Sequence, residues 1–210
     1  MSFISKNAFL TEEEMTINAR YIYRYLTSRG WTGQAVCGML GNMETESTIN
    51  PGIWQNLDEG NTSLGYGLVQ WTPSTKYTSW CAERDLNPSA MGSALARIEW
   101  ELANGEQYYP TDAYPLTFAE FKVSTQSPTY LAMAFLLNYE RPADQTQPAR
   151  GTQAEKWYSI LKGSEGSSGG SEGGSEGDSE GETGGSGTPS TRPKISKLPL
   201  WLLISATRGR

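Results

Sequence analysis

The chain of 210 residues contains no histidine, and this absence excludes several kinds of active site. Nucleophile pairs such as Ser–His and Cys–His cannot form, and neither can the usual histidine-containing zinc site of hydrolases. Any acid–base chemistry must therefore use carboxyl groups, tyrosine, lysine or cysteine. The two cysteines, Cys37 and Cys81, are too few for a disulfide framework and are expected to be buried thiols. We expect neither a metal ion nor a cofactor.

Positive charge is also scarce. The chain has 17 Lys and Arg against 23 Asp and Glu, which gives a net charge of −6. Binding to the phosphates of a nucleic acid requires a basic surface. We therefore expect no nucleic-acid partner.

Long apolar runs are missing as well. The longest, residues 198–206, has nine residues, whereas a membrane-spanning helix needs about 20. The N-terminal residues soon become acidic and show no secretory signal. Lys and Arg flank residues 198–206, so this peptide is expected either to dock on a partner or to rest on an anionic membrane. The alternative is a disordered end.

Charge divides the chain into three regions. Residues 164–187 hold six acidic and no basic residues among Gly, Ser and Thr, which predicts an extended linker because nothing there can be buried. Residues 188–210 hold five basic and no acidic residues. Only residues 1–163 have the composition of a folded domain.

Residues 11–163 show mainly helical patterns. Thr11 followed by Glu14 is typical of a capping box, and the apolar stripe Met15, Ala19, Ile22 and Leu26 follows it. Thr32 is expected to cap a second helix. Further helix starts are expected at Thr72-Pro73, Pro88-Ser89, Thr117, Ser127-Pro128 and Pro148. Between Thr48 and Trp71 turn formers accumulate, which predicts an irregular insertion or a small hairpin.

Glu46 is the first candidate for chemistry. Val36, Met39, Met43 and Glu46 are spaced by three, four and three residues, so Glu46 ends a core-facing stripe. Glu44 lies roughly 200° round the helix and is expected to face water. A carboxyl group among apolar side chains at the negative end of a helix keeps its proton longer, as a general acid must. The alternative is a partly exposed glutamate at a helix end.

Three segments resemble the lysozyme-like superfamily, notably lytic transglycosylases and goose-type lysozymes. Residues 46–51 (ESTINP) resemble the segment that carries the catalytic acid, and residues 67–75 (GLVQWTPST) resemble the segment that lines the sugar cleft. Residues 134–139 (AFLLNY) resemble more weakly a helix whose tyrosine contacts the acid, with Asn and Tyr in reversed order. The resemblance implies a mainly α, lysozyme-like domain with a small irregular or β insertion.

Residues 37–52, 54–73 and 139–142 are together similar to the phage tail lysozyme family, whose nearest members here are the N-terminal domains of tail-knob proteins of small short-tailed phages. This resemblance implies that Glu46 is the catalytic acid and that the substrate is the glycan strand of peptidoglycan. It also implies assembly with other tail proteins into a virion that is made in the host cytoplasm and opens the wall from outside. Those relatives continue into a zinc endopeptidase, an activity that is not expected from a chain without histidine.

The second catalytic group and the cleft have several candidates. Asp58 and Glu59 are the carboxyl groups nearest in sequence, although a turn is the favoured interpretation of this segment. Without a second carboxylate, Glu46 would act with a positioned water or would give a 1,6-anhydro sugar. The expected glycan contacts, each with core packing as its alternative, are Trp54, Tyr66, Gln70, Trp71 and Tyr139.

Two alternatives to a hydrolase stay open. The domain could be a lytic transglycosylase, or a non-catalytic module that binds glycan or forms part of the tail. Glu140 and Arg141 are expected to form an exposed pair of little energetic weight, and Pro142 to end a helix. Trp31, Trp100 and Trp157 are expected in the core.

Overall fold

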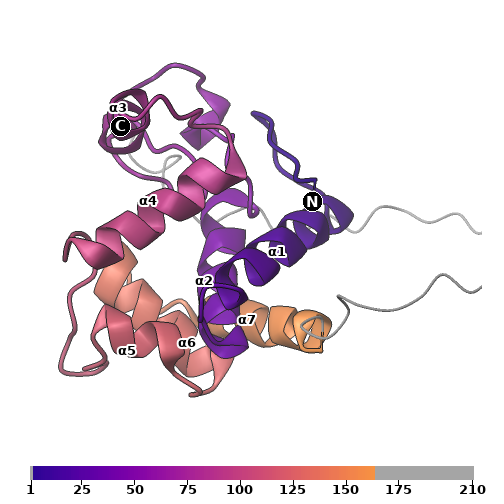
Figure 1. Cartoon of the computed structure of the whole chain (residues 1–210), viewed down its shortest axis with the longest axis vertical. Coiled ribbons are helices and arrows are strands. Elements are labelled where there is room, and N and C mark those ends of the chain that lie inside the picture. The colour runs from indigo at the N-terminus through magenta and orange to yellow at the C-terminus, as the bar shows by residue number, and fades with distance from the viewer. Residues whose placement is uncertain (1, 164–210) are drawn as a thin grey trace, which may run out of the picture.

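The computed structural model describes residues 2–163, and the predicted linker (164–187) and tail (188–210) lie outside the described residues. Figure 1 shows a helical domain, as the sequence predicts. Its elements in chain order are α1 (Glu12–Thr27), α2 (Gly33–Ser47), the short helix η1 (Gln55–Leu57), α3 (Thr75–Ala82), α4 (Met91–Ala103), α5 (Phe118–Val123), α6 (Pro128–Phe135), the π-turn η2 (Leu136–Glu140) and α7 (Pro148–Leu161).

Side-chain caps set the starts of four helices. The Thr11 hydroxyl accepts from the Glu14 amide at the start of α1, and the Glu14 carboxylate accepts from the Thr11 amide in return. Thr32 caps α2 through the amide of Ala35. The predicted starts at Thr117 and Ser127 are confirmed by the same kind of bond. Because each cap satisfies amides that the helix leaves unpaired, local sequence alone places these ends.

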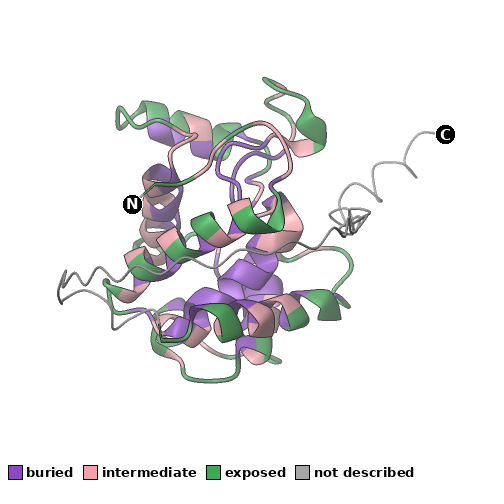
Figure 2. Ribbon diagram, turned by 90° about the vertical axis from the view of Figure 1, so that its right-hand side faces the viewer, coloured by how far each residue is buried: buried purple, intermediate pink, exposed green. Residues whose placement is uncertain are grey.

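Helix α2 runs through the middle of the domain. It contacts α1, α5, α6 and α7, and eleven of its fifteen residues are buried. Figure 2 shows the buried segments gathered where the helices meet, with exposed residues on outer faces and loops. A helix covered on nearly every side is a fixed frame for any side chain that it carries at its end.

Two glycines of α2 allow this close packing. A Cβ on Gly38 would lie 2.8 Å from the Cβ of Leu131 in α6, and a Cβ on Gly41 would lie 2.3 Å from the carbonyl oxygen of Arg150 in α7. Any side chain there would force the helices apart. Gly41 therefore lets the first turn of α7 lie directly against α2.

Glu44 does not face water, contrary to the sequence prediction. Its carboxylate accepts from Lys156 Nζ at 2.9 Å and from Trp157 Nε1 at 2.7 Å, and its side chain is only 15% exposed. The prediction was wrong because it considered α2 alone, whereas α7 covers this side of the helix. Of the tryptophans expected in the core, Trp31 and Trp157 are buried, and Trp100 packs half-buried against the core.

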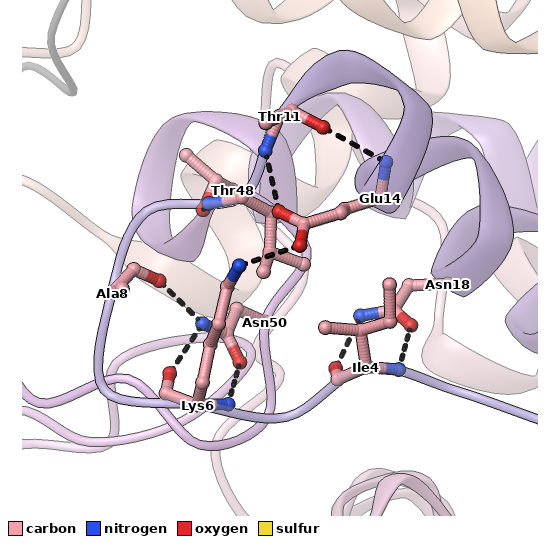
Figure 3. Close-up of polar contacts among 9 residues, drawn as sticks. Ile4, Lys6, Ala8, Thr11, Glu14, Asn18, Thr48 and Asn50 are labelled. Carbon is pink, nitrogen blue, oxygen red and sulfur yellow. Dashed lines mark hydrogen bonds and ion pairs between the residues drawn. The ribbon is translucent and has the colours of Figure 1, made fainter.

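The segment before α1 is held by two buried asparagines, as Figure 3 shows. Asn18 of α1 bonds both the amide and the carbonyl of Ile4, at 2.7 and 2.8 Å. Asn50, just after α2, donates to the carbonyls of Lys6 and Ala8, each at 2.7 Å. These bonds fix the N-terminal segment across the end of α2 because buried amides need such partners.

The insertion between α2 and α3 is irregular. Within residues 2–163 it contains no regular strand, only the isolated bridges Trp54–Tyr66 and Tyr66–Trp71. Side-chain bonds hold it instead, such as the one from Ser47 Oγ to the Leu68 carbonyl at 2.8 Å. Every helix in the described part is too short or too polar to cross a bilayer.

Replacing Gly41 by alanine tests whether close packing of α2 and α7 is required. We expect Gly41→Ala to lower the free energy of unfolding by about 1–3 kcal/mol, because the new methyl group meets backbone atoms of Arg150 and Ala154. The matched control is Gly92→Ala in α4, where a Cβ would meet no atom of another element within 4 Å. The free energy of unfolding of this variant should rise by at most about 1 kcal/mol, because alanine favours a helix more than glycine does. Equal unfolding energies for both variants in urea titrations would contradict this account.

Candidate functional site

A cleft of about 430 Å³ opens where α2, the insertion and the η2 turn meet. Its walls carry carboxyl, amide and aromatic groups together with a few cationic and apolar side chains. Its lining residues are Glu46, Gln55, Val69, Gln70, Trp71, Thr72, Lys76, Gln107, Tyr139, Glu140, Arg141 and Pro142. The cleft therefore brings together the end of α2, the segment before α3 and the chain after α6.

Glu46 lies at the C-terminal end of α2, on the wall of this cleft. Val36, Met39 and Met43 on the same helix face are fully buried, whereas the Glu46 side chain is 16% exposed. Thr48 ends the helix in the left-handed conformation, at φ +54°. The apolar stripe thus ends on a carboxyl group that solvent in the cleft can reach.

Arg150 of α7 is the ion-pair partner of Glu46. Its guanidinium donates through Nη2 to Glu46 Oε1, through Nη1 to Asn42 Oδ1 at 2.9 Å and through Nε to Gln147 Oε1 at 2.7 Å. Arg150 is only 3% exposed, and Asn42 and Glu46 lie four residues apart on one face of α2. Buried charges need such pairing, so this network fixes the orientation of Glu46.

Glu140 is a second carboxyl group on the cleft wall. Its Oε1 atom is buried and has no hydrogen-bonding partner among residues 2–163. Burial raises the pKa of Glu140 well above its usual range, and the negative charge of Glu46 raises it further; Arg150 opposes these effects only in part. Both effects favour the protonated form of this carboxyl group.

The predicted exposed pair of Glu140 and Arg141 was wrong. Within the described residues Glu140 forms no ion pair, and Arg141 turns away, donating to the Gln107 carbonyl at 2.8 Å and lying 4.7 Å from the ring centre of Tyr109. Arg141 takes a left-handed conformation at φ +49°, which ends the π-turn. This reversal separates two side chains that are adjacent in sequence.

Tyr139 lines the cleft but bonds a different carboxyl group from the one expected. Its hydroxyl donates to Glu101 of α4, which also accepts from Trp71 Nε1 and Arg97 Nε, each at 2.9 Å. Burial raises the pKa of Glu101 despite these donors. Tyr139, Trp71 and Glu101 thus join three separate segments behind the cleft wall.

Gln70 and Trp71 lie on the cleft wall. Gln70 takes a left-handed conformation at φ +51°, and its Nε2 donates to the carbonyls of Ile53 and Gly67. Its Oε1 is buried without a partner in the part of the chain that the structure describes. Trp71 stacks on Tyr77 with ring centres 4.2 Å apart.

Trp54 and Tyr66 pack against each other, with ring centres 4.6 Å apart. Tyr66 is only 4% exposed, and its burial raises the pKa of its hydroxyl to about 12. Neither residue is on the wall of the cleft that residues 2–163 form. Their rings therefore contact each other outside the lining of this cleft.

Asp58 and Glu59 are exposed in a turn after η1. Asp58 accepts from Asn61 Nδ2 at 2.8 Å, and its carbonyl accepts from the Asn61 amide at 3.2 Å. Both carboxyl groups lie outside the cleft lining of the described domain. The arrangement is the turn that the residue types favour.

Sequence reasoning missed the three side chains that surround Glu46 and Tyr139. Arg150 lies 104 residues after Glu46, and nothing local marks it as a partner. Glu101 stands in an ordinary amphipathic helix, where a single glutamate carries no signal. Glu140 belongs to the segment that matches the family at 139–142, and its place there was the one available hint.

The chain is similar in sequence to known phage proteins. The profile of the family described as "Phage tail lysozyme" matches residues 17–161, which include all the helices from α2 to α7. The chain is also 60% identical over 167 residues to "Morphogenesis protein 1" of Bacillus phage B103. That alignment covers 80% of this chain but only 45% of the phage protein. The chain belongs to the phage tail lysozyme family.

Proposed function

We propose that this protein is a glycosidase that cleaves the β-1,4 bonds of peptidoglycan glycan strands, with Glu46 as the general acid. The observation that supports this proposal most is the position of Glu46, a carboxyl group at the end of a buried helix on the wall of a polar cleft. Membership of a lysozyme family agrees with it. Glu46 would protonate the bridging oxygen as the bond to the departing sugar breaks.

The lining of the cleft suits a saccharide. Its volume of about 430 Å³ is within the range of small-ligand sites. Gln55, Gln70 and Gln107 can exchange hydrogen bonds with sugar hydroxyl and acetamido groups. Trp71 is buried and stacked on Tyr77, so it supports the wall beside them.

The similarity to a phage morphogenesis protein suggests where this chain acts. A protein named for morphogenesis in Bacillus phage B103 is 60% identical to this chain over their shared region. We infer that this chain, too, is built into a phage tail beside other tail proteins, and that it opens the host cell wall during infection. Its cleft would then act on the wall from outside the cell.

Replacing Glu46 by glutamine should abolish cleavage. Gln keeps the size of the side chain and an oxygen for Arg150 Nη2, but it has no proton to give. We expect the release of fragments from purified cell walls to fall at least about 100-fold. Circular dichroism should show an unchanged fold, and the exposed control Glu83→Gln should keep full activity. Full activity of Glu46→Gln would overturn the assignment.

Removing both candidate carboxylates of the insertion should have little effect. The double variant Asp58→Asn with Glu59→Gln changes two exposed side chains outside the cleft lining of the described domain. We expect turnover within about a factor of two of the wild type. A loss comparable to that of Glu46→Gln would show that this turn supplies the second catalytic group.

The type of product separates the three forms of the proposal. We expect reducing ends from hydrolysis, with a water molecule meeting the oxocarbenium-like centre. If the enzyme is a transglycosylase, mass spectrometry of the released glycan would show 1,6-anhydro ends. These fragments are lighter than the hydrolysed ones by about 18 mass units, because no water is added. No fragments at high protein concentration would favour a binding module.

A further inference from the structure

The ion pair between Glu46 and Arg150 raises a question about the source of the proton. A general acid must hold a proton when the substrate is bound, yet in this structure Glu46 is the carboxylate member of a pair with a buried guanidinium. A second carboxyl group, Glu140, lies on the same cleft wall. Its Oε1 is buried and has no partner in residues 2–163.

The groups that face Glu140 come from every element around it. Glu46 of α2 and Glu101 of α4 place negative charges near it, and Arg150 of α7 and its neighbour Arg141 place positive ones. Burial and the Glu46 charge dominate and raise the pKa of Glu140. The two carboxyl groups of the cleft therefore differ: Glu46 has Arg150 as its counter-ion, whereas Glu140 forms no ion pair in the described domain and its pKa is raised.

We propose that Glu46 and Glu140 form a carboxyl pair that holds a single proton, with Arg150 as the counter-ion of whichever member is ionised. The proposal rests on the proposed function and names a second residue for it. The proton then lies on Glu140, because Arg150 donates to Glu46 and nothing in the described domain donates to Glu140 Oε1. Glu101 is not the residue that holds this proton, since its carboxylate already accepts three hydrogen bonds.

The proton balance of the reaction then closes within the pair. The proton passes from the Glu140 carboxyl group to the Glu46 carboxylate, and the negative charge passes to Glu140. Glu46 gives the proton to the bridging oxygen while the bond between this oxygen and the anomeric carbon breaks, so both carboxyl groups are then ionised. Water adds its hydroxyl group to the anomeric carbon, and its remaining proton returns to the pair. Arg150 offsets one negative charge throughout.

The location of the proton can be measured without activity. In ¹³C NMR of the glutamate-labelled full chain, the side-chain resonance that Glu140→Gln removes should titrate well above the usual glutamate pKa of about 4.3. In Glu46→Gln the same resonance should titrate at lower pH, because a negative charge is gone and Arg150 has lost its carboxylate. Titration of Glu140 in the usual range would overturn the proposal.

Stability offers a second readout with a defined sign. A carboxyl pKa that is raised by folding stabilises the protein below the unfolded value, and this contribution is lost as the pH rises towards the folded pKa. Glutamine does not ionise, so Glu140→Gln does not lose this stability as the pH rises. Its thermal midpoint should therefore equal that of the wild type near pH 4 and exceed it increasingly towards neutral pH. If the thermal midpoint of the variant instead falls below that of the wild type as the pH rises from 4 to neutral, a protonated Glu140 is contradicted.

Kinetics test the role of the pair. We expect Glu140→Gln to lower kcat on soluble glycan fragments by about 100-fold with little change in KM, and to remove the alkaline limb of the pH profile. Glu140→Asp, which keeps a carboxyl group, should restore part of the loss, and Glu83→Gln should match the wild type.

The results distinguish the two proposals. Wild-type kcat and pH profile in Glu140→Gln, with Glu46→Gln inactive, would overturn the carboxyl pair and leave the glycosidase in place. If the wild type releases no glycan fragments, the glycosidase proposal fails, and the NMR titration still decides whether Glu140 holds the proton.

Discussion

The site depends on one contact between distant parts of the chain, the ion pair of Arg150 with Glu46. Gly41 lets the start of α7 approach α2 closely enough for this guanidinium to reach Asn42 and Glu46 on one helix face. Arg150 is almost fully buried, so removing either partner would leave a charge without compensation. The same contact thus fixes the packing of α7 and the orientation of the proposed acid.

A second buried network, centred on Glu101, lies behind the cleft wall. Glu101 accepts hydrogen bonds from Trp71, Arg97 and Tyr139, which belong to the insertion, α4 and η2. This network fixes Trp71 and Tyr139 beside the cleft, as the proposed positioning of a sugar would require. Glu140 lines the same cleft, and its buried oxygen lacks a donor in the described domain. Unpaired buried groups are costly, and their presence at a cleft is typical of sites where chemistry needs them.

The elements were predictable from the sequence where local chemistry decides them. Thr11 with Glu14, Thr32, Thr117 and Ser127 satisfy amides within a few residues, so their helix starts could be read directly. The stripe ending at Glu46 is likewise local. Glu44 and Arg141 could not be placed, because α7 covers one and a left-handed residue turns the other away. Arg150 and Glu101 act across 104 and 38 residues of chain, and no short-range pattern encodes such contacts.

The most direct test of the central claim is a crystal structure of Glu46→Gln with a bound peptidoglycan fragment. We predict that the side chain of residue 46 lies within about 3.2 Å of the bridging oxygen between two sugars, since a general acid must reach the atom that it protonates. A glycan that spans the cleft with its bridging oxygens beyond the reach of residue 46 would contradict the account.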